Sequence, residues 1–426
     1  MTSTAVSAED LKMTDIGPLP SQWKVVKLGV VAKLIMGQSP PGNTYNESGE
    51  GVPFLQGKAE FGNIAPRNIK YTTRPQKIAP RGSVLISVRA PVGDVNVADI
   101  DYCIGRGLAS LSMHEGDNTF LFYMLSHRKE DIETEGTGST FKAINKSKLQ
   151  AFPFAFPPLP EQKKIAYVLS TVQTAIEKTE AAIKAARELK KSLIKYLFTY
   201  GPVSMDEVKN VSLKETEIGM VPEEWDVIRL GEVITFSSKP RDLNLSAHDK
   251  VPFVPMEYIP DERTDISRYQ MKKPEEIRSG TFFFKGDLLV AKITPSFENG
   301  KQCIANNLPS DFAYATTEVW PLHETKRADL LYLFYYLKRK DVRADIAGKM
   351  EGSTGRQRVP RRVLQSLYIP LPPLQIQKQI AHILSIVDRE IEPKENKKEA
   401  LKALFNTLLK NLMTGKIRVN NLEVPV

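Results

Sequence analysis

Two short loops share an order of small, hydroxyl and cationic residues that suits contact with a phosphate. One loop is GTGSTFK at 136–142 and the other is EGSTGRQR at 351–358. Small residues let the backbone approach a phosphate, and hydroxyl and cationic side chains can position a nucleic acid without reading its sequence. The candidate contacts are Gly138, Ser139, Thr140, Lys142, Gly352, Ser353, Thr354, Arg356 and Arg358. A tight turn before a final strand would use the same residues, so both interpretations remain open.

Patterns that would indicate catalysis or a bound cofactor are missing from the sequence. There is no GxxxxGK[ST] phosphate loop, no glycine-rich dinucleotide or S-adenosylmethionine loop and no HExxH motif. The five histidines have no metal-ligand spacing, and Ser139 and Thr140 have no histidine nearby in sequence to activate them. Cys103 and Cys303 match neither a disulfide framework nor a zinc site. We therefore predict a non-catalytic chain that binds no metal or cofactor of its own.

Composition points to a multidomain protein with a modest preference for an anionic partner. The 426 residues give room for two to three domains, and 59 Lys and Arg against 50 Asp and Glu give a net charge of +9. The N-terminus has no basic flank followed by an apolar core, and no apolar run approaches the length of a transmembrane helix. We expect a cytoplasmic protein with no membrane partner.

The two loops each precede a long helical pattern, and these two patterns are copies of one another. The first begins PPLPEQKKIA at Pro157 and the second begins PPLQIQKQIA at Pro372. Apolar residues then recur at alternate steps of four and three, which is the seam of a coiled coil. These seam residues are Ile165, Leu169, Val172 and Ile176 in one copy, and Ile380, Leu384, Val387 and Ile391 in the other. The agreement indicates an internal duplication.

A helix of about 40 residues is roughly 60 Å long, which favours a paired spacer over an ordinary core helix. Two amphipathic helices buried in separate domains are the alternative. Pro393 lies inside the second pattern, where it removes a hydrogen bond, so we expect a kink or break near Glu392.

A second duplication stands in front of each long helix. TDIGPLPSQWKVVKLG at 14–29 matches TEIGMVPEEWDVIRLG at 216–231, and PRGSVLISVRAP at 80–91 matches FKGDLLVAKITP at 284–295. Glycine and proline indicate turns, and the β-rich runs indicate short strands. We read Trp23 and Trp225 as core anchors. The predicted fold is α/β (α+β), with two globular modules that alternate with two long helices.

This arrangement resembles the specificity (S) subunit of type I restriction-modification systems. The resemblance covers almost the whole chain. It rests on the I-G-x-x-P-x-x-W starts at Ile16 and Ile218, the P-P-L-x-x-Q-x-x-I-A helix starts, the two GST loops and the closing LMTGKIRV. It implies target recognition domains at 1–156 and 202–370, conserved helical spacers at 157–201 and 371–418, and a C-terminal tail at 419–426.

The resemblance also implies function. Each recognition domain would read one half of a bipartite double-stranded DNA target, and the helices would pair as an antiparallel coiled coil that sets the spacer. Two methyltransferase (M) subunits would dock on the helical regions, and restriction (R) subunits would add translocation and cleavage. S-adenosylmethionine, ATP and Mg would sit on those partners. Because the two modules differ in their middles, the half-sites should differ too.

Candidate readers of the bases follow from the chemistry of base edges. Arg or Lys pairs with guanine, and other polar side chains contact base edges as well. The candidates are Arg89, Arg106, Lys292, Thr294 and Ser296. When Pro91 is aligned with Pro295, Arg89 and Lys292 are one position apart, which on a strand changes the face. That offset suits different half-sites, and it equally suits two solvated charges.

Two other functions fit the same sequence. One is the recognition subunit of a two-protein, type II-like restriction system in which a single partner both methylates and cuts. The other is a coiled-coil adaptor that joins two proteins and binds no DNA. Salt-dependent affinity for DNA would separate the adaptor from both recognition subunits.

Overall fold

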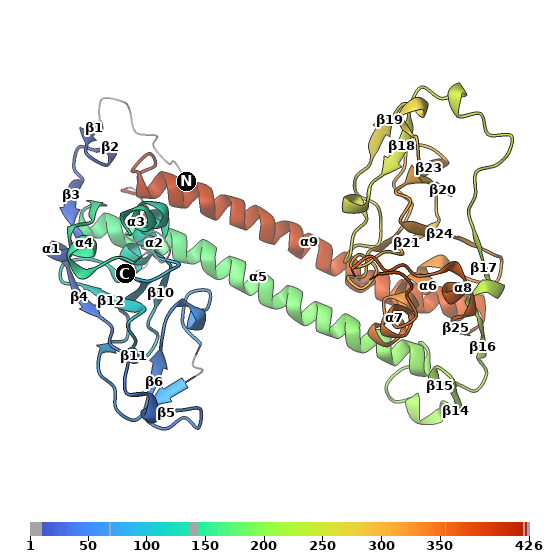
Figure 1. Ribbon diagram of the computed structural model, residues 1–426, viewed down its shortest axis with the longest axis horizontal. Coiled ribbons are helices and arrows are strands. Elements are labelled where there is room, and N and C mark those ends of the chain that lie inside the picture. Colours follow the sequence, from blue (N-terminus) through green and yellow to red (C-terminus); the bar gives the residue numbers. More distant parts are fainter. Residues whose placement is uncertain (1–10, 68–69, 137–142, 354, 421, 424–426) are drawn as a thin grey trace. The chain divides into compact units, whose positions relative to one another are not determined.

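The computed structural model describes residues 11–67, 70–136, 143–353, 355–420 and 422–423 (Figure 1). The chain forms two compact units. Unit 1 comprises residues 1–178 and 398–426, and unit 2 comprises residues 179–397. Helices α5 (Leu159–Tyr200) and α9 (Leu374–Met413) each contribute one end to unit 1 and the other end to unit 2.

Unit 1 is built around two small sheets. A four-stranded antiparallel sheet has the order β10-β9-β12-β4, and a five-stranded mixed sheet has the order β5-β7-β6-β11-β8. Two strand pairs, β1-β2 and β3-β13, complete the unit together with short helices. The strands are β1 (Leu11–Thr14), β2 (Gly17–Pro20), β3 (Lys24–Lys27), β4 (Ala32–Met36), β5 (Tyr45–Asn46), β6 (Val52–Leu55), β7 (Lys70–Thr72), β8 (Ile78–Ala79), β9 (Val84–Ser87), β10 (Val95–Val97), β11 (Tyr102–Ile104), β12 (Leu108–Met113) and β13 (Pro153–Phe156). The helices are α1 (Leu28–Val31), α2 (Asn118–His127), α3 (Lys129–Glu135) and α4 (Lys146–Ala151).

Unit 2 repeats this topology. Its sheets have the orders β17-β24-β21-β22 and β19-β18-β23-β20, and its strand pairs are β14-β15 and β16-β25. The strands are β14 (Leu213–Thr216), β15 (Gly219–Pro222), β16 (Asp226–Arg229), β17 (Ile234–Phe236), β18 (Val251–Val254), β19 (Gln270–Lys272), β20 (Thr281–Phe284), β21 (Leu288–Ala291), β22 (Gln302–Ile304), β23 (Phe312–Ala315), β24 (Val319–Glu324) and β25 (Tyr368–Leu371). The helices are α6 (Leu330–Leu337), α7 (Lys340–Ala347) and α8 (Arg361–Ser366).

The two units also agree in strand direction. β6 pairs with β11 in parallel, and β18 pairs with β23 in parallel, whereas the neighbouring strands are antiparallel. The central strands β9 and β21 are buried at every residue, as expected for apolar runs covered on both faces. The mixed α/β (α+β) class and the internal repeat are therefore confirmed.

The repeated P-P-L-x-x-Q motif has a structural reason. Gln162 is fully buried; its Nε2 donates to the Pro157 carbonyl at 2.8 Å, and its Oε1 accepts from the backbone N of Asp117 at 3.1 Å. Gln377 makes the equivalent bonds to Pro372 at 2.8 Å and to Asp329 at 2.9 Å. Asp117 and Asp329 are the N-caps of α2 and α6. Each glutamine therefore joins the start of a long helix to the start of the helix that packs against its sheet.

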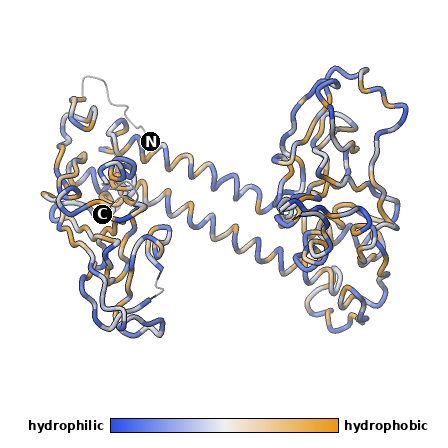
Figure 2. Tube along the Cα trace, in the orientation of Figure 1, coloured by the Kyte–Doolittle hydropathy of each residue, from blue (hydrophilic) through white to orange (hydrophobic). Residues whose placement is uncertain are grey.

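Each unit contains the beginning of one long helix and the end of the other. In unit 1 the start of α5 (Ile165, Leu169) and the end of α9 (Leu412, Met413) share one apolar core. In unit 2 the end of α5 and the start of α9 do the same, and ion pairs Arg187–Glu395 and Lys190–Asp388 show that the numbering of the two helices runs in opposite directions. Figure 2 shows apolar and polar residues alternating along both helices, in agreement with the predicted seam.

Of the kink or break expected near Glu392, the break is wrong, because α9 is one helix from Leu374 to Met413 with Pro393 inside it, and the kink stays a prediction. Proline leaves the carbonyls of the preceding turn short of backbone donors. Lys394, the next residue, donates its Nζ to the carbonyl of Glu390 at 2.9 Å. Across the described ranges, the structure has no helix of the length and apolarity that crossing a membrane requires.

Candidate nucleic-acid interface

In unit 1, the chain that follows the first GST loop is bonded to the end of β9. The backbone N of Ile144 donates to the carbonyl of Val88 at 3.0 Å, and Arg89 forms an antiparallel bridge with Ala143. The turn between β11 and β12 lies on the other side, where the backbone N of Val88 donates to the Gly107 carbonyl at 2.9 Å. We call this meeting point of three segments the strand-end edge of unit 1, residues 88–89, 106–107 and 143–144.

Unit 2 has the same edge. The backbone N of Val359 donates to the Lys292 carbonyl at 2.8 Å, and Ile293 forms an antiparallel bridge with Arg358. The backbone N of Lys292 donates to the carbonyl of Glu318 at 3.0 Å. The strand-end edge of unit 2 is therefore residues 292–296, 317–318 and 357–359. Lys292, Thr294 and Ser296 therefore lie beside Arg358 at this edge, although more than 60 residues separate them from it in the sequence.

The bridges also settle how the two edges correspond. Arg89 bridges the segment after the first GST loop, and Ile293, not Lys292, bridges the segment after the second. This is the one-residue offset given by aligning Pro91 with Pro295, and both prolines follow cis peptide bonds. The first edge therefore presents an arginine where the second has isoleucine.

The two arginine side chains at the edge of unit 1 are exposed cations. Arg89 and Arg106 are exposed, and within the described ranges neither guanidinium has a hydrogen bond or an ion pair. Only the backbone N of Arg106 is engaged, by Ser39 Oγ at 3.4 Å. A free guanidinium at the end of a rigid strand has both of its donor edges available to a planar acceptor.

In unit 2 the charged side chains at the edge are held by neighbouring groups. Arg358 donates through Nε and Nη2 to the two carboxylate oxygens of Glu318, at 2.9 and 2.8 Å. This pairing lowers the pKa of Glu318 and raises that of Arg358. Lys292 lies over the ring of Trp320, with Nζ 4.2 Å from the centroid, and burial lowers the pKa of its ammonium. This edge presents a fixed carboxylate–guanidinium fork beside a half-buried ammonium.

The remaining predicted contacts differ in their availability. Thr294 donates its hydroxyl to Glu298 at 2.7 Å, and Ser296 is half-buried next to it. Ser353 and Arg356 are exposed, and Gly352 adopts φ +125°, a conformation that favours glycine. Gly138, Ser139, Thr140, Lys142 and Thr354 lie outside the described residues.

Sequence reasoning missed Glu318 and Trp320. Trp320 packs under Lys292 and donates its Nε1 to the Val359 carbonyl at 2.9 Å, so it supports the edge without being part of a motif. Glu318 stands where unit 1 has Gly107, since their carbonyls accept equivalent bonds. Aligning the turn before β12 with the turn before β24 would have shown this difference.

Within the described part of the chain, no cluster of His, Cys, Asp or Glu is arranged to hold a metal.

Comparisons with known proteins bear on both units. The type I restriction modification DNA specificity domain matches residues 20–186 and again residues 222–403. The chain is 48% identical to a putative type I restriction enzyme MjaX specificity subunit of Methanocaldococcus jannaschii over 195 residues, which cover 45% of this chain and 46% of the relative. It is 25% identical to the MjaVIII specificity subunit of the same organism over 427 residues, 95% of each chain.

The fold is similar to that of a solved structure. The crystal structure of a type I restriction-modification S subunit from M. genitalium superposes with a TM-score of 0.64 at 18% identity, covering 95% of this chain and 98% of that one. At this identity the likeness concerns the fold alone.

Proposed function

Because the chain belongs to the family of the type I restriction modification DNA specificity domain, we infer that it is the DNA-recognition subunit of a restriction-modification complex. Each unit presents one recognition domain, and each domain reads one half of a bipartite double-stranded DNA target. The observation that carries this inference is the duplicated strand-end edge, which keeps the same backbone frame in both units and carries different side chains.

The chemistry of the edges supports two unlike half-sites. Arg89 and Arg106 in unit 1 suit guanine, whose O6 and N7 accept bidentate bonds from arginine. In unit 2 the Glu318 carboxylate can accept from the amino group of cytosine, while Arg358 beside it donates to the paired guanine or to a phosphate. The recognised target is therefore asymmetric, and the GST loops position the duplex.

The catalytic steps belong to partner subunits, and the long helices offer matched places for two copies of one partner. Leu189 on α5 and Leu404 on α9 are 55% and 46% exposed, and they are 215 residues apart, which is the offset of the duplication. Small residues flank each leucine at equivalent exposed positions: Ala185 and Ser192 on α5, and Ala400 and Thr407 on α9.

The exposed surface around Leu189 lies in unit 2, and the equivalent surface around Leu404 lies in unit 1. Equivalent surfaces in a duplicated chain bind equivalent partners, and two methyltransferase subunits fit this arrangement. S-adenosylmethionine would then be bound by those subunits, and ATP and Mg by restriction subunits.

Modified-base sequencing of the host genome, with and without this gene, tests the function. A bipartite methylated motif should disappear when the gene is deleted and return when it is restored. Exchanging residues 40–150 for those of a relative should change one half of the motif and leave the other half unchanged. Survival of every modified motif after deletion would reject DNA recognition and favour an adaptor that binds no DNA.

A further inference from the structure

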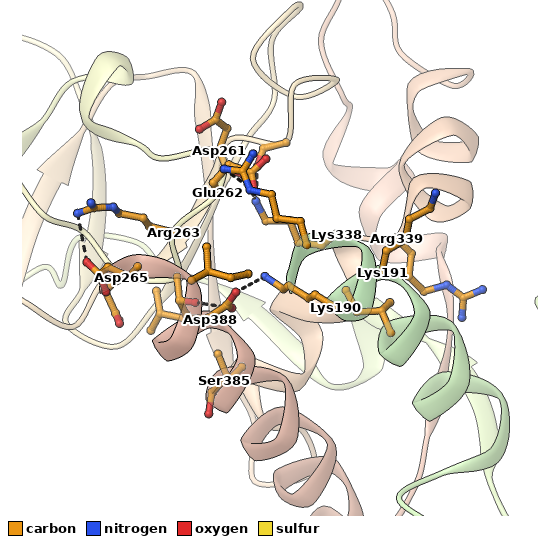
Figure 3. A pocket seen from close by; sticks show the side chains of 18 of the residues that line it. Lys190, Lys191, Asp261, Glu262, Arg263, Asp265, Lys338, Arg339, Ser385 and Asp388 are labelled. Carbon is orange, nitrogen blue, oxygen red and sulfur yellow. Dashed lines mark hydrogen bonds and ion pairs between the residues drawn. The ribbon is translucent and has the colours of Figure 1, made fainter. Parts of the chain in front are cut away.

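In unit 2 the globular part meets its two helix segments around an open cavity of about 1130 Å³ (Figure 3). The cavity is lined by charged side chains of α5, α9, the loop between β18 and β19, and the segment that follows α6. Polar bonds bridge this space between the loop and the helices, beside the apolar core that the end of α5 and the start of α9 share with the globular part.

Asp388 of α9 lies at the centre of these bonds. Its Oδ1 is 2.5 Å from Lys190 Nζ of α5, and its Oδ2 accepts from the hydroxyl of Tyr335 of α6 at 2.7 Å and from Thr264 of the β18–β19 loop at 3.3 Å. Lys190 also lies over the Tyr335 ring at 5.2 Å. The side chains of Asp388 and Lys190 are 18% and 14% exposed. One carboxylate therefore joins both long helices to two segments of the globular part.

A second set of bonds continues along the same helix face. Arg263 of the β18–β19 loop pairs with Glu392 at 3.2 Å and donates to Asn396 Oδ1 at 3.0 Å. Arg187 of α5 pairs with Glu395 at 2.6 Å, and Glu262 lies 3.9 Å from the same guanidinium. The loop is thus held to α9 at Asp388 and again at Glu392 and Asn396, about one and two turns further along the helix.

The loop is in turn fixed to the body of the globular part. Lys338 donates its Nζ to the carbonyls of Asp261 and Gly300, the latter at 2.9 Å. Lys301 donates to the carbonyls of Met256 and Ile259 at 2.9 and 3.0 Å. The bonds between Asp388 and the loop therefore connect α9 to the body of the globular part.

Unit 1 makes the equivalent contact with apolar groups. The duplication places Gln173 at the position of Asp388, Phe405 at that of Lys190 and Tyr123 at that of Tyr335. Tyr123 packs edge-on against Phe405, with centroids 5.9 Å apart, and its hydroxyl meets Ser170 at 3.3 Å. Gln173 bonds Glu177 on its own helix at 3.3 Å. The directional, charged form of this contact thus belongs to unit 2.

We propose that Asp388 is a positioning residue that fixes the angle of the second recognition domain on its helices and thereby restricts the length of DNA spacer that the complex accepts. This inference rests on the proposed function. Adding or removing one base pair moves a half-site by about 3.4 Å and turns it by about 35°. A domain held by directional bonds rejects that displacement, whereas a loosened domain follows it.

The test compares spacer lengths with the full chain bound to its methyltransferase partners. The DNA carries the methylated motif of the host, with its natural spacer or with one base pair more or less. The measured quantity is the ratio of affinity for the natural spacer to affinity for each altered spacer. We expect D388N to lower this ratio by about five- to thirtyfold and to leave the preferred bases of both half-sites unchanged. Y335F, which removes one bond, should lower it less.

Glu390→Gln is the matched control, because the Glu390 side chain is 69% exposed and pairs with Lys394 on the surface of the same helix. It should keep the natural ratio. If D388N does not fold, Y335F and T264V decide the question, since each removes a single bond to Asp388. Natural ratios in the folded variants, or an equal loss in E390Q, would overturn the positioning role. A natural complex with no preference for a bipartite target would instead reject the proposed function.

Discussion

The buried carboxylate of Glu161 in unit 1 leads to a stability prediction, because the second copy of the duplicated sequence has an apolar residue at the same position. Glu161 at the start of α5 is 4% exposed and accepts from Trp23 Nε1 at 2.8 Å. Arg418, whose side chain is 13% exposed, donates to its two oxygens at 2.5 and 2.9 Å. The equivalent residue of the second copy is Ile376. We therefore consider the substitution Glu161→Ile, which replaces the carboxylate by the apolar side chain that the repeat uses.

The expected cost follows from the groups left behind. Trp23 is fully buried, so its indole N–H loses its acceptor, at about 1–3 kcal/mol. Arg418 loses its ion pair, and breaking a buried pair by removing one partner costs about 3–5 kcal/mol. Arg418 retains some access to water and a 3.3 Å bond to Gln22, which reduces the cost. We expect Glu161→Ile to lower the free energy of unfolding of unit 1 by about 3 kcal/mol.

Trp23 also provides the assay, because the other tryptophans, Trp225 and Trp320, belong to unit 2. In a W225F/W320F background, indole fluorescence during denaturant unfolding reports unit 1 alone. Glu135→Gln is the control, since the Glu135 carboxylate is 55% exposed and 3.9 Å from Lys148, and it should cost less than about 0.5 kcal/mol.

The double variant E161I/R418M should recover at least about 1 kcal/mol relative to E161I, because the unpaired charge is then removed as well. A natural unfolding midpoint for E161I would refute the reasoning. So would a double variant that loses the sum of the two single losses.

Three further predictions concern the interface, a buried lysine and the helix surfaces. Arg89→Ala and Arg106→Ala should each reduce discrimination at one half-site by about 1–3 kcal/mol and leave the other half of the methylated motif unchanged; equal weakening at all sequences would assign them to phosphates. Burial lowers the pKa of Lys338 from 10.5 to about 7, so between these values the unfolded chain binds more protons. Stability of unit 2 should then rise with pH from about 7 to 10.5, by up to about 1.4 kcal/mol per unit, and Lys338→Met should abolish that rise in melting experiments. Leu189→Asp and Leu404→Asp should each remove one methyltransferase copy from the purified complex, since an exposed leucine buried by a partner contributes about 1.5–3 kcal/mol; two retained copies would place docking elsewhere.

The duplication made most of the architecture predictable from sequence. Gln162 and Gln377 stood out because they recur, and the motif placed the helix starts within two residues of Leu159 and Leu374. Their role was not predictable, because the bonded backbone groups at Asp117 and Asp329 lie more than 40 residues away. Pro393 shows the opposite error, since a local rule about proline allowed a break where α9 continues as one helix.

The candidate interface was predictable only in part, and for a related reason. Sequence pattern selected the strand ends and the GST loops, because glycine, proline and β-rich runs mark them. It could not show that Lys292 is half-buried on Trp320 or that Arg358 is held by Glu318, since these pairings depend on which turns meet at the edge. Asp388 escaped notice because its three bonded groups come from three separate segments.

One duplicated backbone frame can carry two unlike recognition edges because of the kind of bonds that build it. Bonds between backbone groups build each edge: Val88 with Ile144 and Gly107, and Lys292 with Val359 and Glu318. Such bonds do not depend on side-chain identity, so an exposed edge residue can change without loss of the frame. Arg89 and Ile293, which make equivalent backbone bridges, differ in this way, whereas Gln162 and Gln377, which serve the frame through their side chains, are identical. Side chains at the edge are therefore free to follow the DNA target, and those beneath it are not.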